Sequence, residues 1–175
     1  LDAPGSLLRQ SYRNPDGTGL GTFDEDGRPR VEKAPIAAYL DTTFAREAKE
    51  RRSSTFLAHV RYGTGTPVAM RNTHPLEMEG RLFAHNGNLA GLPALREHLG
   101  SDLARVHGDT DSELVFALIT RETHRAGGDG EPLAAVGAHG EQAIAGELSP
   151  PHRSPVGAGE AVHPAEGVGA LRYRG

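Results

Sequence analysis

The segment that most restricts the fold of this chain is LFAHNGNL at residues 82–89, where an apolar run meets an Asn-Gly pair. Asn86-Gly87 is the dipeptide most typical of a type I′ β-hairpin turn, because both residues tolerate positive φ. A hairpin needs a second strand immediately, whereas Leu92, Leu95 and Leu99 have helical spacing. The sequence therefore predicts strand, Asn-Gly, loop and helix, with the hairpin turn as the alternative.

The same pair also has a possible chemical use. The side-chain amide of Asn86 and the backbone N–H of Gly87 can point at one place. Two such donors stabilise an oxygen that becomes negative during acyl transfer. This interpretation requires supporting groups elsewhere in the chain.

Length and charge limit the classes of protein to consider. A chain of 175 residues and 18.6 kDa is long enough for one domain with a core. The net charge of −4 and the dispersed arginines offer no basic surface for nucleic acid. No apolar run approaches the roughly 20 residues that span a bilayer, and no leader pattern is present. We expect a cytoplasmic protein with a small-molecule substrate and neither a nucleic-acid nor a membrane partner.

Cysteine and histidine usage indicates neither a metal nor a cofactor. The chain has no cysteine, so it offers no disulfide, no thiolate ligand and no thiol nucleophile. The nine histidines form no zinc-binding pattern. Gly17, Gly19 and Gly21 resemble a nucleotide loop only superficially, because no helix opens after them.

Hydrophobic periodicity predicts the elements of the first half. The acidic, Gly-containing segment within residues 1–33 separates two strand-like runs and fits a hairpin. Residues 35–52 have the pattern of an amphipathic helix, and residues 55–62 that of a central strand.

A helix start is predicted near residue 110, before a change of composition. Thr110 and Glu113 match a capping box, which places Asp111 in the first helical turn. Residues 126–175 are rich in Gly, Pro, Ala and His, and only residues 132–148 could hold a helix, with no convincing strand after them. We expect this tail to be poorly ordered.

Three polar groups stand at the ends of predicted elements: Arg61, Asn86-Gly87 and Asp111. Separately, they fit a surface ion pair, a turn and a residue favoured by the helix dipole. Together, they offer a guanidinium for a carboxylate and a carboxylate for an ammonium, the two charges of a free α-amino acid. The side chain of that amino acid would lie toward Asn86-Gly87.

Four motifs give the sequence a family resemblance. AHVRYGTG, NTHP, FAHNGNL and GDTDSE occur in the order and approximate spacing found in class II glutamine amidotransferases. The chain most resembles small stand-alone members of that family, over residues 1–125, which we expect to form the amidotransferase domain. The resemblance implies an α+β fold of the N-terminal-nucleophile hydrolase type, a four-layer αββα sandwich of antiparallel sheets, here incomplete at both ends.

The resemblance also implies roles for individual residues. Asn86 and the N–H of Gly87 would form the oxyanion hole, Arg61 would hold the substrate α-carboxylate, and Asp111 would hold the α-ammonium. Thr64 and Gly65 would lie beside the glutamine. The NTHP segment would be a structural turn near the pocket, with His74 structural rather than catalytic.

Two departures from the family affect the expected activity. The family's nucleophile is an N-terminal cysteine whose α-amine acts as base, whereas this chain begins LDAP and looks truncated at its start. Its tail also lacks the further apolar strands of the family. We therefore expect an amidotransferase-type domain for the γ-amide of glutamine or of a γ-glutamyl amide that is inactive as given. The alternative is a catalytically silent module that binds an amino acid.

Overall fold

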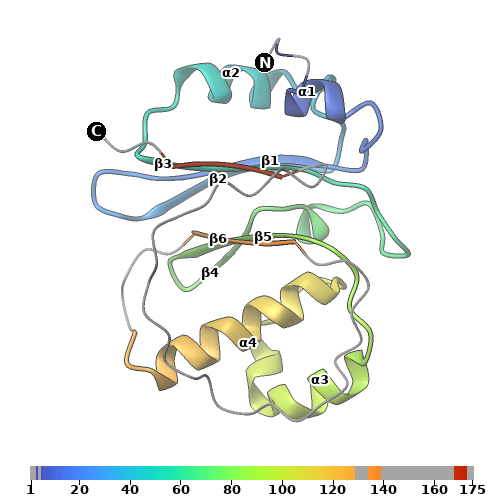
Figure 1. Cartoon of the computed structure of the whole chain (residues 1–175), viewed down its shortest axis with the longest axis vertical. Coiled ribbons are helices and arrows are strands. Elements are labelled where there is room, and N and C mark those ends of the chain that lie inside the picture. Colours follow the sequence, from blue (N-terminus) through green and yellow to red (C-terminus); the bar gives the residue numbers. More distant parts are fainter. Residues whose placement is uncertain (1–2, 4, 129–133, 139–167, 173–175) are drawn as a thin grey trace.

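The computed structural model describes residue 3, residues 5–128, and the backbone of residues 134–138 and 168–172. Its elements form two β-sheets and two groups of helices, shown in Figure 1. None of the helices within these described residues is long and apolar enough to span a membrane.

The first sheet has the strand order β2-β1-β3-β7, with antiparallel pairing throughout. Its strands are β1 (Thr18–Phe23), β2 (Pro29–Ala34), β3 (Thr55–Val60) and β7 (Val168–Arg172). The predicted hairpin is confirmed, since β1 and β2 pair directly, with Phe23 opposite Pro29. The predicted central strand is confirmed as well, because β3 has a partner on each side.

The second sheet has the order β4-β5-β6 and contains one parallel pair. Its strands are β4 (Leu76–Met78), β5 (Arg81–Asn86) and β6 (Ala134–Ala138). The expectation of purely antiparallel sheets is therefore wrong at β5–β6. The chain passes through helices between these two strands, and such a crossover returns it in the same direction.

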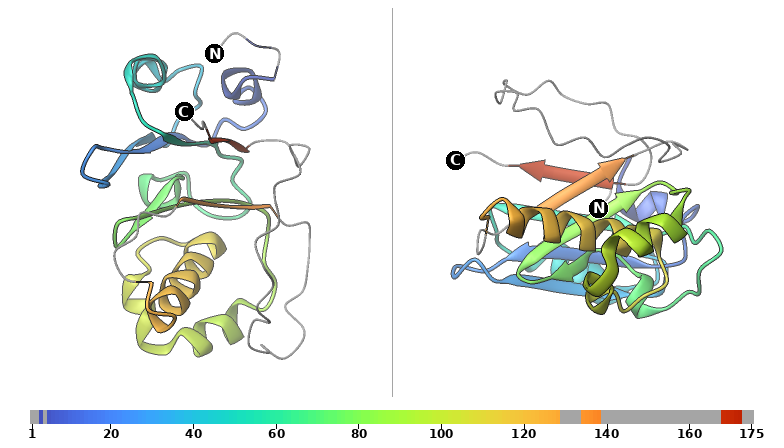
Figure 2. Two further views of the ribbon diagram at one scale, coloured as in Figure 1. Left: turned by 60° about the vertical axis from the view of Figure 1, so that its left-hand side comes forward. Right: turned by 90° about the horizontal axis from the view of Figure 1, so that it is seen from below.

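Helices cover both sheets. Helices α1 (Leu7–Gln10) and α2 (Thr42–Glu50) contact the first sheet, and α4 (Asp111–Arg125) contacts the second, with α3 (Leu92–Leu99) packed beside it. Figures 1 and 2 show the two groups on opposite sides of the pair of sheets. Short 3₁₀ helices occupy Met70–Asn72 (η1) and Gly100–Arg105 (η2).

Hydrophobic residues fill the spaces between these layers. Leu57 of β3 meets Leu82 and Ala84 of β5, so one cluster lies between the two sheets. A second cluster joins the first sheet to α1 and α2, and contains Leu20 and Phe44. The third lies between the second sheet and its helices: Leu76, Met78, Phe83, Leu95, Leu99, Leu114, Phe116 and Ala117.

The start of α2 differs from the sequence prediction. The helix begins at Thr42, where the Asp41 carboxylate accepts a hydrogen bond from the backbone N–H of Phe44 at 3.0 Å. Tyr39 and Leu40, which the periodic pattern placed inside the helix, precede it and are 41% and 61% exposed. An N-cap carboxylate satisfies a free backbone donor, and this local bond sets the boundary.

Helix α4 begins as predicted. The Thr110 hydroxyl accepts from the backbone N–H of Glu113 at 3.3 Å. The Glu113 carboxylate accepts from the backbone N–H groups of His107 and Gly108, at 3.0 and 2.5 Å. Glu113 therefore fixes the loop that leads into the helix, and with it the position of Asp111 in the first turn.

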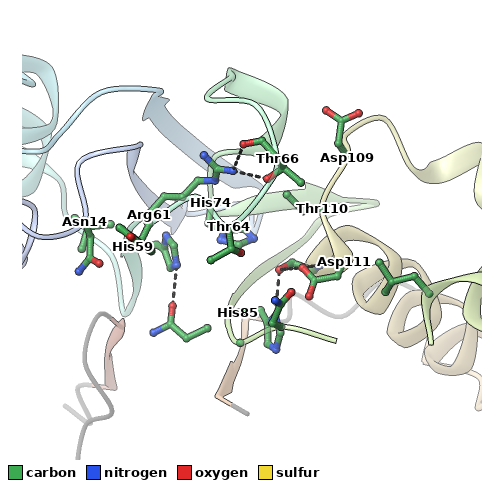
Figure 3. A pocket seen from close by; sticks show the side chains of 17 residues that line it. Asn14, His59, Arg61, Thr64, Thr66, His74, His85, Asp109, Thr110 and Asp111 are labelled. Atoms are coloured by element: carbon green, nitrogen blue, oxygen red, sulfur yellow. Dashed lines mark hydrogen bonds between the residues drawn. The ribbon is translucent and has the colours of Figure 1, made fainter. Parts of the chain in front are cut away.

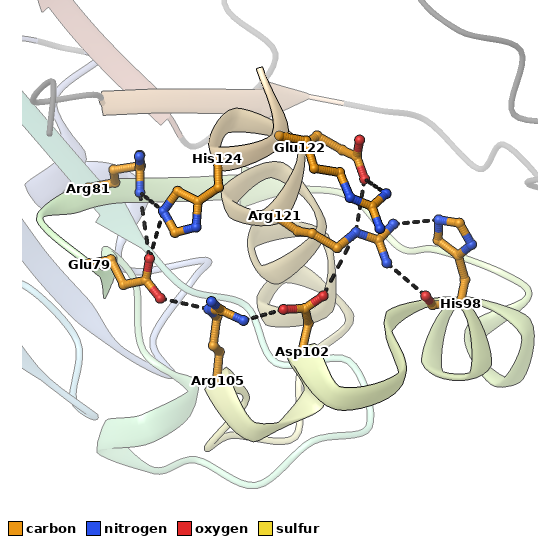
Figure 4. Close-up of polar contacts among 9 residues, drawn as sticks. Glu79, Arg81, His98, Asp102, Arg105, Arg121, Glu122 and His124 are labelled. Carbon is orange, nitrogen blue, oxygen red and sulfur yellow. Dashed lines mark hydrogen bonds and ion pairs between the residues drawn. The ribbon is translucent and has the colours of Figure 1, made fainter. Parts of the chain in front are cut away.

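Charged side chains anchor the other end of α4, as Figure 4 shows. Glu79, in the turn between β4 and β5, pairs with Arg105 at 2.6 Å and with His124 at 2.9 Å. Arg105 also pairs with Asp102, and Arg121 donates to the His98 carbonyl at 2.7 Å. These contacts connect α4 to α3, η2 and the second sheet, so both ends of the helix are fixed.

The described residues of the tail, 134–138 and 168–172, differ in secondary structure from the sequence prediction. Residues 134–138 form strand β6 within residues 132–148, the one part of the tail that could have held a helix, and residues 168–172 form β7 where no convincing strand was expected. Both strands complete sheets by pairing with β5 and β3. Small residues such as Ala and Gly carry a weak β signal, so tertiary pairing decides their conformation. The prediction that the rest of residues 126–175 is poorly ordered concerns residues that lie, for the most part, outside the described ones.

Candidate active site

Arg61 follows β3 directly and is only 4% exposed. Its backbone N–H donates to the Gly17 carbonyl at 2.8 Å. One guanidinium nitrogen, Nη2, donates to the Thr66 hydroxyl at 2.6 Å and to the Thr66 carbonyl at 3.3 Å. The other, Nη1, is buried and has no hydrogen-bond partner within the described part of the chain. Arg61 is thus anchored by one nitrogen while the other can receive an anion.

Asn86 ends β5, and Gly87 follows it with a φ of +151°. Side-chain-bearing residues rarely adopt such a φ, which accounts for the glycine. The chain then runs to α3 at Leu92 without a strand, so the hairpin-turn alternative is wrong. The predicted order of strand, Asn-Gly, loop and helix is confirmed.

Asp111 is the first residue of α4, and its carboxylate reaches across to the loop after β5. Its Oδ2 accepts from the backbone N–H of Leu89 at 2.7 Å, and its Oδ1 accepts from the backbone N–H of Ser112 at 2.8 Å. A carboxylate has about four lone-pair sites, so it can accept further hydrogen bonds. Asp111 therefore holds the Asn-Gly loop and still presents acceptor capacity.

One cavity of about 450 Å³ brings these groups together. Arg61, Thr64, Asn86, Gly87 and Asp111 line it, and Figure 3 shows several of the lining side chains. Gly65 does not line the cavity; it adjoins Thr64 with a φ of +80°. The other lining residues are Asn14, His59, Val60, Tyr62, Thr66, His74, His85, Asn88, Leu92, Asp109, Thr110 and Ser112.

The NTHP segment adjoins the cavity, which its His74 lines. Asn72 exchanges two hydrogen bonds with Asp109: its Nδ2 donates to the Asp109 carboxylate at 3.0 Å, and its Oδ1 accepts from the Asp109 N–H at 2.9 Å. Lys33 donates to the Thr73 carbonyl at 2.8 Å. A Cβ at Gly19 would collide with the carbonyl oxygen of His74, so this glycine allows the segment to lie against β1. These contacts hold the segment against β1 and the loop before α4, and its role as a structural turn, which the resemblance implied, stays a prediction.

Two buried histidines in the cavity wall, His59 and His85, were not among the residues that the sequence indicated for the site. The Nε2 of His59 lies 3.0 Å from the Asn86 Oδ1, and the Nδ1 of His85 lies 3.1 Å from the Ser112 hydroxyl. Alternation along a strand puts His59 on the same face as Arg61, two residues later. This two-residue spacing from Arg61 is the feature of the sequence that could have indicated His59 as a cavity residue.

Burial keeps His59 and His74 uncharged near pH 7. Burial, reinforced by the positive charge of Arg61, lowers the pKa of His59 from 6.5 to about 4. Burial also holds the pKa of His74 well below 6.5, and neighbouring His59 and Lys33 act in the same direction. The His74 ring stands edge-on to the His59 ring, with centroids 4.5 Å apart. Arg61 is therefore the cation that an anionic ligand meets beside these two rings.

These depressed pKa values predict a loss of stability in mild acid. An unfolded histidine takes up a proton near pH 6.5, whereas folded His59 does so only near pH 4. The unfolded state therefore binds more protons in this window, and stability falls as the pH falls from 6.5 to 4. Between pH 7 and 5, His59 alone should lower the free energy of unfolding by about 2 kcal/mol. Denaturant titrations at both pH values measure this change.

A histidine variant isolates the contribution of His59. In His59→Gln the decrease between pH 7 and 5 should be smaller by about 2 kcal/mol. His107→Gln, at an exposed histidine outside the cavity wall, serves as the control. An equal pH dependence in wild type and His59→Gln would contradict the prediction.

Comparisons with known proteins show the family to which this chain belongs. The family model for class II glutamine amidotransferases matches residues 7–144, most of the chain. The chain belongs to this family.

Individual relatives cover the same region. The glutamine–fructose-6-phosphate aminotransferase (isomerizing) of Bradyrhizobium diazoefficiens is 31% identical over 115 residues, 65% of this chain and 18% of that protein. The protein of the same name from Wigglesworthia glossinidia brevipalpis is 29% identical over 123 residues, 70% of this chain and 20% of that protein. An uncharacterized protein of Methanocaldococcus jannaschii is 33% identical over 127 residues, 69% of this chain and 34% of that protein. The chain thus matches about a fifth of the length of these aminotransferases.

Proposed function

We propose that the cavity binds glutamine, or a γ-glutamyl amide, by its α-amino acid end. The observation that carries this proposal is the buried Nη1 of Arg61, which has no partner in the described part of the chain, in one cavity with the Asp111 carboxylate. A guanidinium pairs with the α-carboxylate, and an aspartate accepts from the α-ammonium. Leaving a buried guanidinium nitrogen unpaired costs free energy, which a bound carboxylate would recover.

The γ-amide of the bound molecule would then lie at Asn86 and Gly87. In amide hydrolysis a nucleophile adds to the carbonyl carbon of the γ-amide, and the carbonyl oxygen takes the negative charge. The Asn86 side-chain amide and the Gly87 N–H would donate to that oxygen. Collapse of the adduct releases ammonia or an amine and leaves an acyl-enzyme, which water hydrolyses to glutamate. Thr64, and Gly65 next to it, would lie beside the glutamine.

We also infer the fold type from the arrangement of layers. Helices contact the outer faces of two sheets that pack together through Leu57, Leu82 and Ala84. This arrangement supports the αββα sandwich of N-terminal-nucleophile hydrolases, to which the family's chemistry belongs.

A catalytically silent binding module is the second candidate. The observation that favours it is the absence of cysteine from the 175 residues. The serines nearest the start have structural partners: the Ser6 hydroxyl caps α1, and the buried Ser11 hydroxyl donates to the Leu8 carbonyl at 2.7 Å and accepts from the Tyr39 N–H. Both candidates use the same amino acid pocket and differ only in turnover.

Arg61→Lys tests the proposed pocket. Lysine keeps the charge but cannot form a two-point contact with a carboxylate or reproduce the anchor to Thr66. We expect the affinity for glutamine and for glutamate, measured by calorimetry, to fall by about tenfold or more. Arg28→Lys, at an exposed arginine paired with Asp26, is the matched control and should leave affinity unchanged. Equal affinities in wild type and Arg61→Lys would remove Arg61 from the pocket.

A further inference from the structure

The main chain of Arg61 is held by the segment that leads into β1. The Arg61 N–H donates to the Gly17 carbonyl at 2.8 Å, and the Arg61 carbonyl accepts from the Asp16 N–H at 3.0 Å. These two bonds continue the antiparallel pairing of β1 with β3, in which Thr18 lies opposite Val60. They fix where the arginine side chain begins but not where its guanidinium lies, because that side chain has several rotatable bonds.

The guanidinium of Arg61 contacts two parts of the loop that follows β3. Its Nη2 donates to the hydroxyl of Thr66, as Figure 3 shows. The main chain of Gly63 lies against the same group, since a Cβ on Gly63 would be 3.0 Å from Nη1 and 3.3 Å from both Cζ and Nη2. Gly63 is not one of the glycines with a positive φ, so its backbone conformation would accept a side chain. The guanidinium is what occupies the space that this side chain would need.

Asp16 holds Gly63 from outside the cavity. The Asp16 Oδ2 accepts from the backbone N–H of Gly63 at 2.7 Å, and the residue is half-buried. A hydrogen bond to an ionised acceptor is stronger than one between neutral groups. Neither Asp16 nor Gly63 lines the cavity, whereas Arg61 and Thr66 do. The Asp16 carboxylate is therefore placed to hold the loop and not to contact a ligand.

We propose that Asp16 is a positioning residue for Arg61: by holding Gly63, it keeps residues 62–66 folded against the guanidinium and Nη1 available to the α-carboxylate of the ligand. The inference rests on the proposed function, because it requires Arg61 to bind that carboxylate. Nη1 is buried without a hydrogen-bond partner among the described residues, so no bond of its own fixes its position. A donor that is held in place before the ligand arrives lowers the cost of ordering on binding.

Calorimetry with glutamine tests this role of Asp16. In Asp16→Ala, which has no acceptor for the Gly63 N–H, we expect affinity to fall by about tenfold. Asp16→Asn keeps a side-chain oxygen that can accept this bond, and we expect affinity within about threefold of wild type. Asp26→Ala, at an exposed aspartate paired with Arg28, is the control and should leave affinity unchanged.

A double-mutant cycle separates positioning of Arg61 from ordinary packing. Arg61→Lys already lacks the guanidinium fork, so nothing remains for Asp16 to position. Adding Asp16→Ala to Arg61→Lys should therefore lower affinity for glutamine by less than about threefold further. A loss that only weakens the fold would lower affinity equally in both backgrounds.

Gly63→Ala perturbs the guanidinium directly and does not depend on whether Asp16→Ala folds. The added methyl group would displace the guanidinium while the Asp16 carboxylate stays in place. We expect affinity for glutamine to fall by about tenfold. Gly5→Ala is the control, because an added Cβ there has no other atom within 4 Å.

The outcomes of these measurements are distinct. A fall in Asp16→Ala that is restored in Asp16→Asn and absent from the Arg61→Lys background supports the positioning role. Unchanged affinity in Asp16→Ala or in Gly63→Ala, or an equal fall in both backgrounds, overturns it and leaves the proposed function intact. A wild-type protein that does not bind glutamine overturns the proposed function and this inference with it.

Discussion

A polypeptide of these 175 residues is expected to release no ammonia from glutamine beyond a residual rate. The reaction needs a strong nucleophile, and these residues contain no thiol. Oxyanion donors and binding groups alone leave a rate on the order of 10³-fold above water, as in hydrolases whose nucleophile has been deleted. This is near the background of a coupled ammonia assay, while calorimetry on the same sample should still detect bound glutamine.

Robust ammonia release that disappears in Asn86→Ala would contradict this prediction. The search for a nucleophile would then begin at Ser112, whose hydroxyl lies in the cavity wall 3.1 Å from the Nδ1 of His85. Loss of activity in Ser112→Ala, with glutamine binding retained, would identify it. Activity that persists in Asn86→Ala would instead indicate a contaminating glutaminase.

The second large effect is expected for a substitution of Asn86. It is measured in a variant to which an N-terminal segment with the family's cysteine has been added. Asn86→Ala should lower kcat by on the order of 10²–10³ and leave KM nearly unchanged. The reason is that the amide acts mainly on the oxygen of the transition state. Steady-state kinetics with glutamine measure both constants.

Asn88→Ala is the matched control for this experiment. Asn88 also lines the cavity, two residues further along, but it is exposed and has no proposed contact with the carbonyl oxygen of the substrate's γ-amide. It should change kcat by less than about threefold. If Asn86→Ala changed KM alone, the Asn-Gly pair would serve ground-state binding or loop shape rather than charge stabilisation.

The groups proposed to bind substrate were visible in the sequence because each stands at the end of an element. Arg61 follows a strand, Asn86 ends one, and Asp111 begins a helix. Strand alternation and helix capping are local rules, so a single sequence is enough to place such residues. Their meeting in one cavity was inferred from complementary charges, and the cavity brings them together.

The parts that were missed depend on contacts between distant segments. His59 was read as part of a buried strand, since its partner Asn86 lies on the other sheet. Strand β6 consists largely of Ala and Gly, and β7 contains Gly and Ala between larger residues, so only pairing with β5 and β3 reveals them. Helix α2 starts later than the apolar periodicity predicted, because the Asp41 carboxylate caps the helix at Thr42. Each error arises where tertiary or capping interactions override local propensity.

The pairing of β7 with β3 has a consequence for biosynthesis. Residues 61–167 separate the end of β3 from the start of β7, and synthesis of such a segment takes on the order of ten seconds. Throughout that time, one edge of β3 lacks its final partner. An open strand edge can recruit a strand from another nascent chain. Slow translation or dense polysomes should therefore favour aggregation of this protein before β7 emerges.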